Sequence, residues 1–168
     1  FDFGQNLTGW VEVEIYGDKG QKLTLRHAEA LDENGNFYTE NLSWAKATDT
    51  YILSGGKQTL HPHFTWHGFR YICVEGLQYG QNVQFTACHL STDLVQTGHF
   101  TCSDKRVNRL QQNIQWSQRD NFLDIPTDCP QRDERMGWTG DIAVFAPTAA
   151  FNFDMNRFLD KWLLDVRA

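Results

Sequence analysis

The sequence lacks several features that would assign it at once to a class. No apolar run approaches the roughly 20 residues of a membrane-spanning helix, so no membrane partner is expected. The net charge of −6 argues against a nucleic-acid binder, which would carry a basic face. There is no phosphate-binding loop, internal repeat or low-complexity segment, and no cofactor is expected. The four cysteines (Cys73, Cys88, Cys102 and Cys129) contain no Cys-x-x-Cys pair, which predicts reduced structural thiols.

Aromatic residues, in contrast, are abundant, with six Trp and twelve Phe. Such side chains fill cores, but they also line sugar sites, because the C–H faces of pyranoses pack on flat rings. The 168 residues suffice for one medium domain or two small ones. The chain starts at Phe1 without a signal segment and stops at Ala168 directly after a helical pattern. We interpret it as a fragment cut at both ends, so cytoplasmic, secreted and periplasmic locations all remain open.

Residues 1–98 have the pattern of an antiparallel, jelly-roll-like β-sandwich. Trp10–Ile15 and Lys22–Arg26 both alternate apolar and polar residues, and we expect them to pair as a hairpin through a loop of about five or six residues. Asp32–Asn36 is predicted to turn at Asn34-Gly35. Further strands are predicted at Ala47–Leu53, His63–Trp66, Phe69–Val74 and Val83–Leu90, separated by glycine-rich turns.

Residues 99–168 change to a helical period. Ser103 is the predicted N-cap of a helix that runs to about Phe122, with Val107, Leu110 and Ile114 on one face. Ile142–Phe151 predicts a buried helix that Pro147 kinks or splits. Asp154 is expected to cap a last helix with the apolar stripe Phe158, Leu159, Trp162, Leu163 and Val166. Three such helices cannot close a core alone, so we predict the N-terminal part of a larger, truncated helical domain.

Thr127–Asp141 is the stretch with the most chemistry, because acids and arginines are interleaved there without a periodic apolar face. A carboxyl group close to other carboxylates can keep its proton near neutral pH, as a general acid must. Trp138 and Asp141 lie four and seven residues after Glu134, and we expect all three on the same side of a helix or tight turn. Carboxylates, arginines and an indole together predict a carbohydrate site.

Each of these residues also has a purely structural interpretation. Asp141 could cap the helix that follows Gly140. Arg132 and Arg135 could form surface ion pairs, Trp138 could fill the core, and Glu134 could be a solvated surface acid.

The loop closely resembles the signature of the bacterial α-L-rhamnosidases of glycoside hydrolase family 78. The segments that carry the resemblance are Asp2–Trp10, Arg26–Leu31, Thr48–Tyr51, Phe64–Tyr71, Asp124–Arg135 and Phe145–Ala149. Together they cover essentially the whole chain. The resemblance implies a β-sandwich domain over residues 1–98, followed by the first helices of an (α/α)6-barrel catalytic domain over residues 99–168.

The resemblance also implies a role for each residue of the signature. Glu134 matches the general acid that protonates the leaving oxygen. Asp128 and Asp141 match acids that bind rhamnose hydroxyls, Arg132 matches the arginine that joins them, and Trp138 matches an aromatic of the sugar subsite. The implied reaction is the inverting hydrolysis of terminal α-L-rhamnosides, with a rhamnose-containing glycoside or oligosaccharide as partner. The general base would be a Glu beyond the end of this chain, so we expect the fragment alone to be inactive.

Other interpretations stay open at this point. The chain could come from an (α/α)6-barrel glycosidase of other sugar specificity, or from a non-catalytic carbohydrate-binding β-sandwich. His61, His63 and His67 suggest a metal, but no carboxylate or cysteine stands near them in sequence, so we expect structural histidines and no metal site. The sequence does not define the rhamnoside or the oligomeric state.

Overall fold

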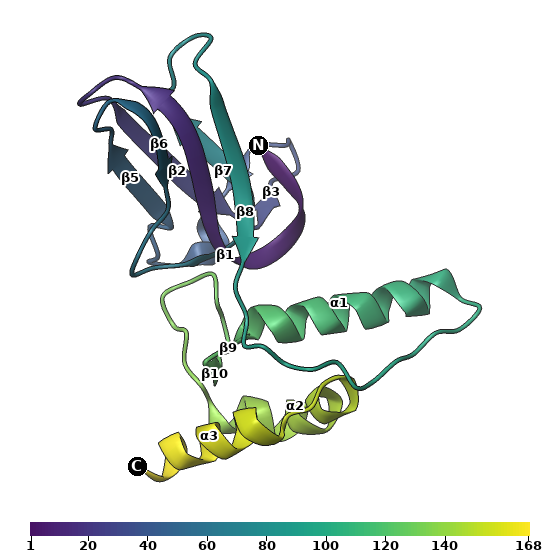
Figure 1. Cartoon of the computed structure of the whole chain (residues 1–168). Coiled ribbons are helices and arrows are strands. Elements are labelled where there is room, and N and C mark those ends of the chain that lie inside the picture. Colours follow the sequence, from purple (N-terminus) through teal and green to yellow (C-terminus); the bar gives the residue numbers. More distant parts are fainter. The chain divides into compact units, whose positions relative to one another are not determined.

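The computed structural model describes all 168 residues and divides them into two compact units (Figure 1). The first unit comprises Phe1–Leu90 with Gln131–Asp133, and the second comprises Ser91–Pro130 with Glu134–Ala168. The first is built of antiparallel strands and the second contains three helices, which confirms the predicted fold class. None of the helices is both long and apolar enough to cross a membrane.

The first unit is organised around one long strand, β1 (Asp2–Gly17), that is shared between two parts of the sheet. The other main strands are β2 (Lys22–Ala28), β5 (Thr48–Ile52), β6 (Gly56–Leu60), β7 (His67–Glu75) and β8 (Val83–His89). The N-terminal half of β1 pairs with β7, and its C-terminal half pairs with both β6 and β8. The change falls at Gly9, which faces both His67 and His89. Any Cβ at Gly9 would collide with the carbonyl oxygen of Cys88, so only glycine fits there.

The period-two pattern of the sequence defines the core of this unit. Val11, Val13 and Ile15 of β1 and Leu23 and Leu25 of β2 are all at most 1% exposed. Alternation places such residues on one face of each strand, and burying each side chain contributes about 1.5–3 kcal/mol. The predicted turn also forms, since Gly35 N–H donates to Asp32 O at 3.0 Å. Short elements complete the unit: β3 (Ala30–Leu31), β4 (Phe37–Tyr38) and a 3-10 helix (Glu40–Leu42).

The predicted hairpin between the first two strands is wrong. β2 lies between β5 and β7, whereas the C-terminal half of β1 already has β6 and β8 on its two edges. The connecting turn is closed by Gln21 N–H donating to Asp18 O, and Gly20 N–H donates to Leu53 O at 2.8 Å. The connection therefore carries the chain from one part of the sheet to the other.

Two further assignments in this region need correction. His63–Trp66 is not a strand, and β7 begins only at His67. Sequence reasoning also missed β6, because Gly56–Leu60 contains a single large apolar residue, Leu60. Hydrogen-bonded pairing with β1 holds Gly56–Leu60 as a strand, although the segment has few apolar side chains to bury.

The second unit contains α1 (Lys105–Asn121), α2 (Thr139–Asn152) and α3 (Asn156–Arg167). It also contains a short hairpin whose strands, β9 (Phe122–Leu123) and β10 (Ile125–Pro126), have two residues each. The N-cap of α1 is Asp104 rather than Ser103, and its side chain accepts from Arg106 N–H at 2.8 Å. At α3 the cap residue is Met155, while Asp154 accepts from Asn156 N–H at 3.0 Å. In both cases an Asp carboxylate thus accepts from a free N–H group in the first turn of the helix.

The helices bury only one face, although the sequence predicted a buried helix at Ile142–Phe151. α2 runs unbroken through Pro147, yet Val144 is 84% exposed and Phe151 is 56% exposed. On α1, Val107 and Leu110 are likewise exposed. Three helices offer each other too little surface to cover every apolar side chain. The core that does form contains Phe122, Ile142, Ala149, Phe153, Met155 and Phe158.

Candidate active site

The acid-rich loop connects β10 to α2 without regular secondary structure. Hydrogen bonds hold both of its ends. Thr127 donates to Asn121 O from its backbone N–H at 2.8 Å and from its hydroxyl at 2.7 Å. Asp128 N–H donates to Met136 O at 3.0 Å, while Met136 N–H donates to the Asp128 carboxylate at 2.9 Å. Arg135 turns the chain with φ of 50°, a value that non-glycine residues rarely adopt. These bonds hold Asp128 beside the residues that follow Glu134.

Glu134 lies between an indole and a second carboxyl group. Trp138 Nε1–H donates to Glu134 Oε1 at 2.9 Å, which places both side chains on one side, as their spacing predicted. Side-chain ligand atoms of Asp128, Cys129 and Glu134 all lie within 4.8 Å of one another. The Asp128 carboxylate also accepts a hydrogen bond from the Glu134 carboxyl group. Two carboxyl groups in such contact must share a proton.

The surroundings of Asp128 decide which of the two acids is ionised. Burial pushes the pKa of Asp128 upward, but the N–H groups of Met136 and Cys129, the Cys129 thiol and the Glu134 carboxyl group all donate to it. These donors outweigh burial, and the pKa of Asp128 lies below its ordinary value. Asp128 is therefore held as the anion that accepts from these donors. A neutral acid beside an anionic hydrogen-bond acceptor is the division of roles that a glycosidase needs.

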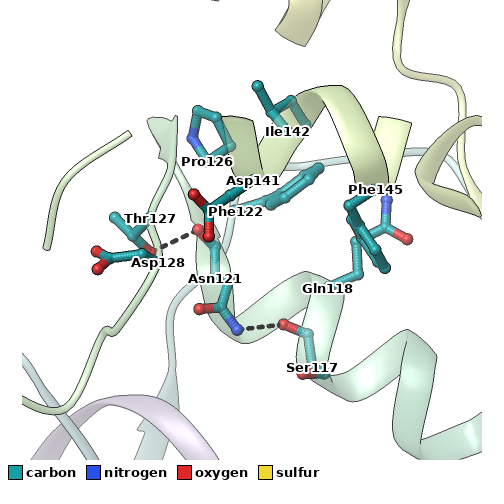
Figure 2. Close-up of a pocket in the computed structure, with 10 residues that line it drawn as sticks. All are labelled: Ser117, Gln118, Asn121, Phe122, Pro126, Thr127, Asp128, Asp141, Ile142 and Phe145. Carbon is teal, nitrogen blue, oxygen red and sulfur yellow. Dashed lines mark hydrogen bonds between the residues drawn. The ribbon is translucent and has the colours of Figure 1, made fainter. Parts of the chain in front are cut away.

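A pocket of about 180 Å³ opens beside Asp128 (Figure 2). Asp128 and Asp141 both line it, and Phe122, Ile142 and Phe145 contribute apolar surface. Pockets for drug-sized ligands span roughly 300–1,000 Å³, so this one suits a single small ring. Asp141 is not the N-cap of α2, since the helix begins at Thr139 after Trp138. Its exposed carboxylate in the first turn is available to a ligand.

The structure brings four of the five predicted residues into one unit. Asp128, Glu134, Trp138 and Asp141 belong to the second unit, whereas Arg132 belongs to the segment Gln131–Asp133 of the first. Trp138 is 49% exposed and does not fill the core, so one of the structural interpretations fails. Its ring is accessible to a sugar while its N–H group is engaged.

Sequence reasoning missed the part played by Cys129. All four cysteines are free, as predicted, but the Cys129 thiol donates to the Asp128 carboxylate. A lone cysteine gives no sequence signal for this role, because only the loop conformation turns the thiol toward its neighbour. It could have been suspected only from its position directly after Asp128.

Gly137 packs closely against the ring of Trp162, and replacing the glycine tests this packing. A Cβ at Gly137 would lie 2.6 Å from the ring of Trp162, which therefore has to move. We expect Gly137→Ala to lower the free energy of unfolding by about 1–3 kcal/mol, as overpacked sites do. Gly140→Ala is the matched control, because a Cβ there meets nothing within 4 Å and alanine favours the helix. Thermal unfolding followed by tryptophan fluorescence measures both, and equal stability of the two variants would refute the packing argument.

A sheet unit is followed by a helical unit whose loop carries two acids in contact and an accessible indole, groups that suit carbohydrate binding. The family model described as bacterial alpha-L-rhamnosidase concanavalin-like domain matches residues 1–91. The model described as bacterial alpha-L-rhamnosidase 6 hairpin glycosidase domain matches residues 95–168. The chain belongs to the bacterial alpha-L-rhamnosidase family, which confirms the resemblance found in the sequence.

Curated relatives and solved structures agree with this assignment. An alpha-L-rhamnosidase of Streptomyces avermitilis is 49% identical over 168 residues, which are 99% of this chain and 16% of that protein. Its crystal structure complexed with L-rhamnose superposes with a TM-score of 0.93 over the same shares. The native alpha-L-rhamnosidase of Aspergillus terreus is 49% identical with a TM-score of 0.93, covering 98% of this chain and 19% of that one. The chain thus spans less than a fifth of the length of these relatives.

Proposed function

We propose that the protein containing this chain is an inverting α-L-rhamnosidase that hydrolyses terminal α-L-rhamnosides. Membership of the family supports the proposal. The observation that carries it is the setting of Glu134, whose carboxyl group contacts the anionic Asp128 and the indole N–H of Trp138. A surface acid without a function would have no need of either partner.

In this mechanism Glu134 gives its proton to the glycosidic oxygen as the bond to the anomeric carbon breaks. Trp138 Nε1–H remains on Oε1 and stabilises the carboxylate that forms. In the empty site the Glu134 proton is directed at Asp128. When a sugar binds, one of its hydroxyls takes that place at Asp128, and the acid turns to the leaving oxygen. Water attacks the opposite face of the sugar and passes a proton to a second carboxylate.

That second carboxylate is the general base, for which the family resemblance implies a Glu in a later segment. Inverting pairs stand roughly 6.5–9.5 Å apart, with the water between them. Asp128 and Glu134, which are in hydrogen-bond contact, are too close to form such a pair. Asp128 is accordingly assigned to sugar binding and to holding the proton on Glu134.

The remaining signature residues bind the sugar. Asp128 and Asp141 accept hydrogen bonds from hydroxyl groups at the pocket. For Arg132, the family resemblance alone implies a role in sugar binding. Trp138 presents its ring face to the C–H groups of the pyranose. The pocket volume limits the ligand held by the second unit to a single ring, in keeping with a terminal sugar.

The stereochemistry of the product tests the proposal. The protein expressed from its complete reading frame should convert an α-L-rhamnosyl disaccharide first into β-L-rhamnose, which then mutarotates. Proton NMR of the anomeric region during the first turnovers measures this. Initial formation of the α-anomer would contradict inversion, and hydrolysis of other glycosides in preference to rhamnosides would favour a different sugar specificity.

Trp138→Phe separates the indole N–H from the ring face. The variant loses one hydrogen bond to Glu134, worth about 1–1.5 kcal/mol, so kcat on the disaccharide should fall roughly tenfold. KM should change little, because an aromatic face remains. Trp44→Phe is the control, since Trp44 is 87% exposed in the first unit and should leave both constants unchanged. A rise in KM with unchanged kcat in Trp138→Phe would mean that Trp138 binds sugar without acting on the acid.

A further inference from the structure

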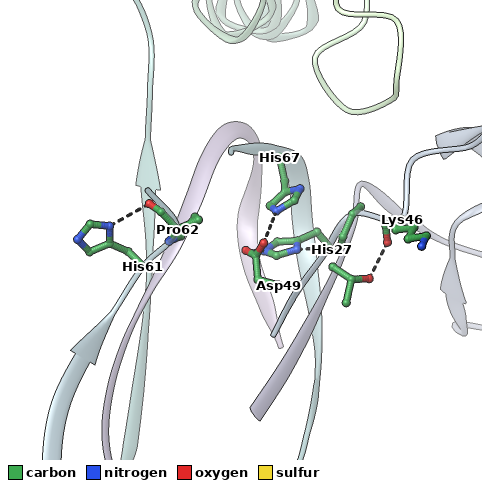
Figure 3. A network of polar contacts seen from close by, with 8 residues as sticks. His27, Lys46, Asp49, His61, Pro62 and His67 are labelled. Carbon is green, nitrogen blue, oxygen red and sulfur yellow. Dashed lines mark hydrogen bonds and ion pairs between the residues drawn. The ribbon is translucent and has the colours of Figure 1, made fainter. Parts of the chain in front are cut away.

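His67 lies in a buried polar cluster of the first unit with His27 and Asp49 (Figure 3). The three residues come from neighbouring strands, because β2 lies between β5 and β7. His67 Nε2 is 3.0 Å from Asp49 Oδ1, and His27 Nε2 is 3.9 Å from Asp49 Oδ2. The side chains of His27, His67 and Asp49 are only 0%, 7% and 10% exposed.

The orientation of His27 leaves a nitrogen lone pair inside this cluster. Its Nδ1 is 3.0 Å from Ala47 O, a carbonyl that can only accept, so the ring proton is on Nδ1. Nε2 then carries a lone pair, is buried, and has no hydrogen-bond partner. The His27 lone pair and the Asp49 carboxylate thus lie 3.9 Å apart in a buried cluster, an arrangement that a shared cation would stabilise.

We propose that His27 Nε2, His67 Nε2 and the Asp49 carboxylate form a binding site for a divalent transition metal, with Zn²⁺ the best match. Two imidazoles and a carboxylate are zinc ligands, at distances of about 2.0–2.2 Å. Ligands on one such ion lie roughly 3–3.5 Å apart, and the donor atoms here all lie within 4.8 Å of one another. The rings of His27 and His67 are stacked with centroids 4.0 Å apart, so both rings have to turn before their Nε2 atoms converge on one ion.

The surroundings of the cluster fit this assignment. Zinc-bound histidines almost always donate their other ring N–H to a carbonyl or carboxylate, as His27 does to Ala47. Ca²⁺ and Mg²⁺ prefer oxygen ligands, so two imidazoles disfavour them. Tyr51 lies two residues beyond Asp49 on the same face of β5, and its buried hydroxyl has no partner. The hydroxyl group is thus a further polar group on the strand face that carries Asp49.

Metal binding requires the proton on His67 Nε2 to move. His67 Nε2 now faces Asp49 Oδ1 at hydrogen-bond distance, and as the donor it carries the ring proton. On coordination that proton moves to Nδ1 or to solvent, and the lone pair of Nε2 goes to the ion. The ion would cross-link β2, β5 and β7. The expectation of a purely structural His67 arose because its partners lie 18 and 40 residues away in sequence.

His61 and His63 do not belong to this site. His61 stacks on Trp10, with ring centroids 5.6 Å apart, and its Nδ1 contacts Pro62 O. His63 packs against His61 at 4.9 Å. The two therefore offer a matched control with histidines in the same unit.

The test uses the protein expressed from its complete reading frame, stripped with EDTA and then dialysed against Zn²⁺. We expect wild type to hold one more Zn²⁺ per chain than Asp49→Asn, with His63→Gln equal to wild type. Co²⁺ added to stripped wild type should give the visible absorption of a tetrahedral site, and Asp49→Asn should lack it. Zn²⁺ should also raise the Tm of wild type and leave that of Asp49→Asn unchanged.

Equal zinc content in wild type and Asp49→Asn, with no cobalt absorption in wild type, would overturn the proposal. Should Asp49→Asn fail to fold, His67→Gln replaces it, and nitrogen NMR of the wild-type imidazoles decides without any variant. Zn²⁺ should displace the Nε2 signals of His27 and His67. Signals that respond to pH but not to Zn²⁺ would mean that the cluster holds only a proton, and the metal site would be refuted.

Discussion

Glu134→Gln is expected to lower kcat/KM on an α-L-rhamnosyl disaccharide by about 10²–10⁴-fold, the usual contribution of general acid catalysis. Glutamine keeps the size of the side chain and an oxygen for the Trp138 N–H, but it has no proton to give. A sugar leaving group needs that proton, because its alkoxide is a poor leaving group. On nitrophenyl rhamnoside the fall should be much smaller, since nitrophenolate leaves without help. Steady-state kinetics on the two substrates measure the difference.

The comparison of leaving groups makes this prediction specific. A folding defect would lower both rates by the same factor, whereas loss of the acid lowers mainly the disaccharide rate. Glu33→Gln is the control, because Glu33 is an exposed acid in the Asp32–Asn36 turn of the other unit. Wild-type rates for Glu134→Gln on both substrates would show that Glu134 takes no part in catalysis. The loop would then serve to bind a ligand or to support the structure.

Asp128→Asn should lower kcat/KM on both substrates by about 10²-fold or more. Hydrogen bonds to a charged group contribute about 1.5–3 kcal/mol each, and losing about 3 kcal/mol corresponds to roughly 10²-fold. The asparagine amide turns an NH₂ group toward donors from Met136 and Cys129 that need an acceptor. It also removes the anion that favours a protonated Glu134. Calorimetric titration with L-rhamnose should show weakened binding, in contrast to Glu134→Gln.

The pH dependence of binding gives a second check on Asp128. Its pKa is depressed, so the carboxylate should stay ionised as pH falls from 7 past its ordinary value of 3.8. Binding that depends on this anion is therefore present above that value and lost only at lower pH. Affinity of wild type for L-rhamnose should be constant between pH 7 and about pH 4.5. A decline already near pH 6 would mean that burial wins over the donors, and that the carboxyl group we assign as the anion is the protonated one.

The sequence predicted those parts of the structure that depend on local pattern. Val11, Val13 and Ile15 alternate and are buried, and Glu134 and Trp138 meet across one turn. The strand partners could not be predicted, since β1 and β2 follow each other yet never pair. Which edge a strand uses is decided by the whole sheet, and alternation is the same whichever neighbour is chosen.

In the site, too, residues close in sequence could be predicted, whereas contacts that depend on the fold could not. The loop signature pointed to the proposed acid and its neighbours, because they lie within fifteen residues of sequence. The contact of the Cys129 thiol with Asp128 depends on a loop conformation that includes a left-handed Arg135. The His27–Asp49–His67 cluster depends on strand order. Neither leaves a periodic trace in the sequence.

The sharing of β1 between two parts of the sheet has a consequence for synthesis. Residues Gly9–Ile15 pair with Val83–His89, so the first strand of this unit to be synthesised waits for the last strand of the same unit. Until then one edge of β1 stays open and prone to wrong pairing. With contacts this distant in sequence, folding in milliseconds to seconds is expected, rather than the microseconds of a helical bundle. A nascent chain halted before Val83 should therefore be protease-sensitive throughout, and resistance should arise only once His89 has cleared the exit tunnel.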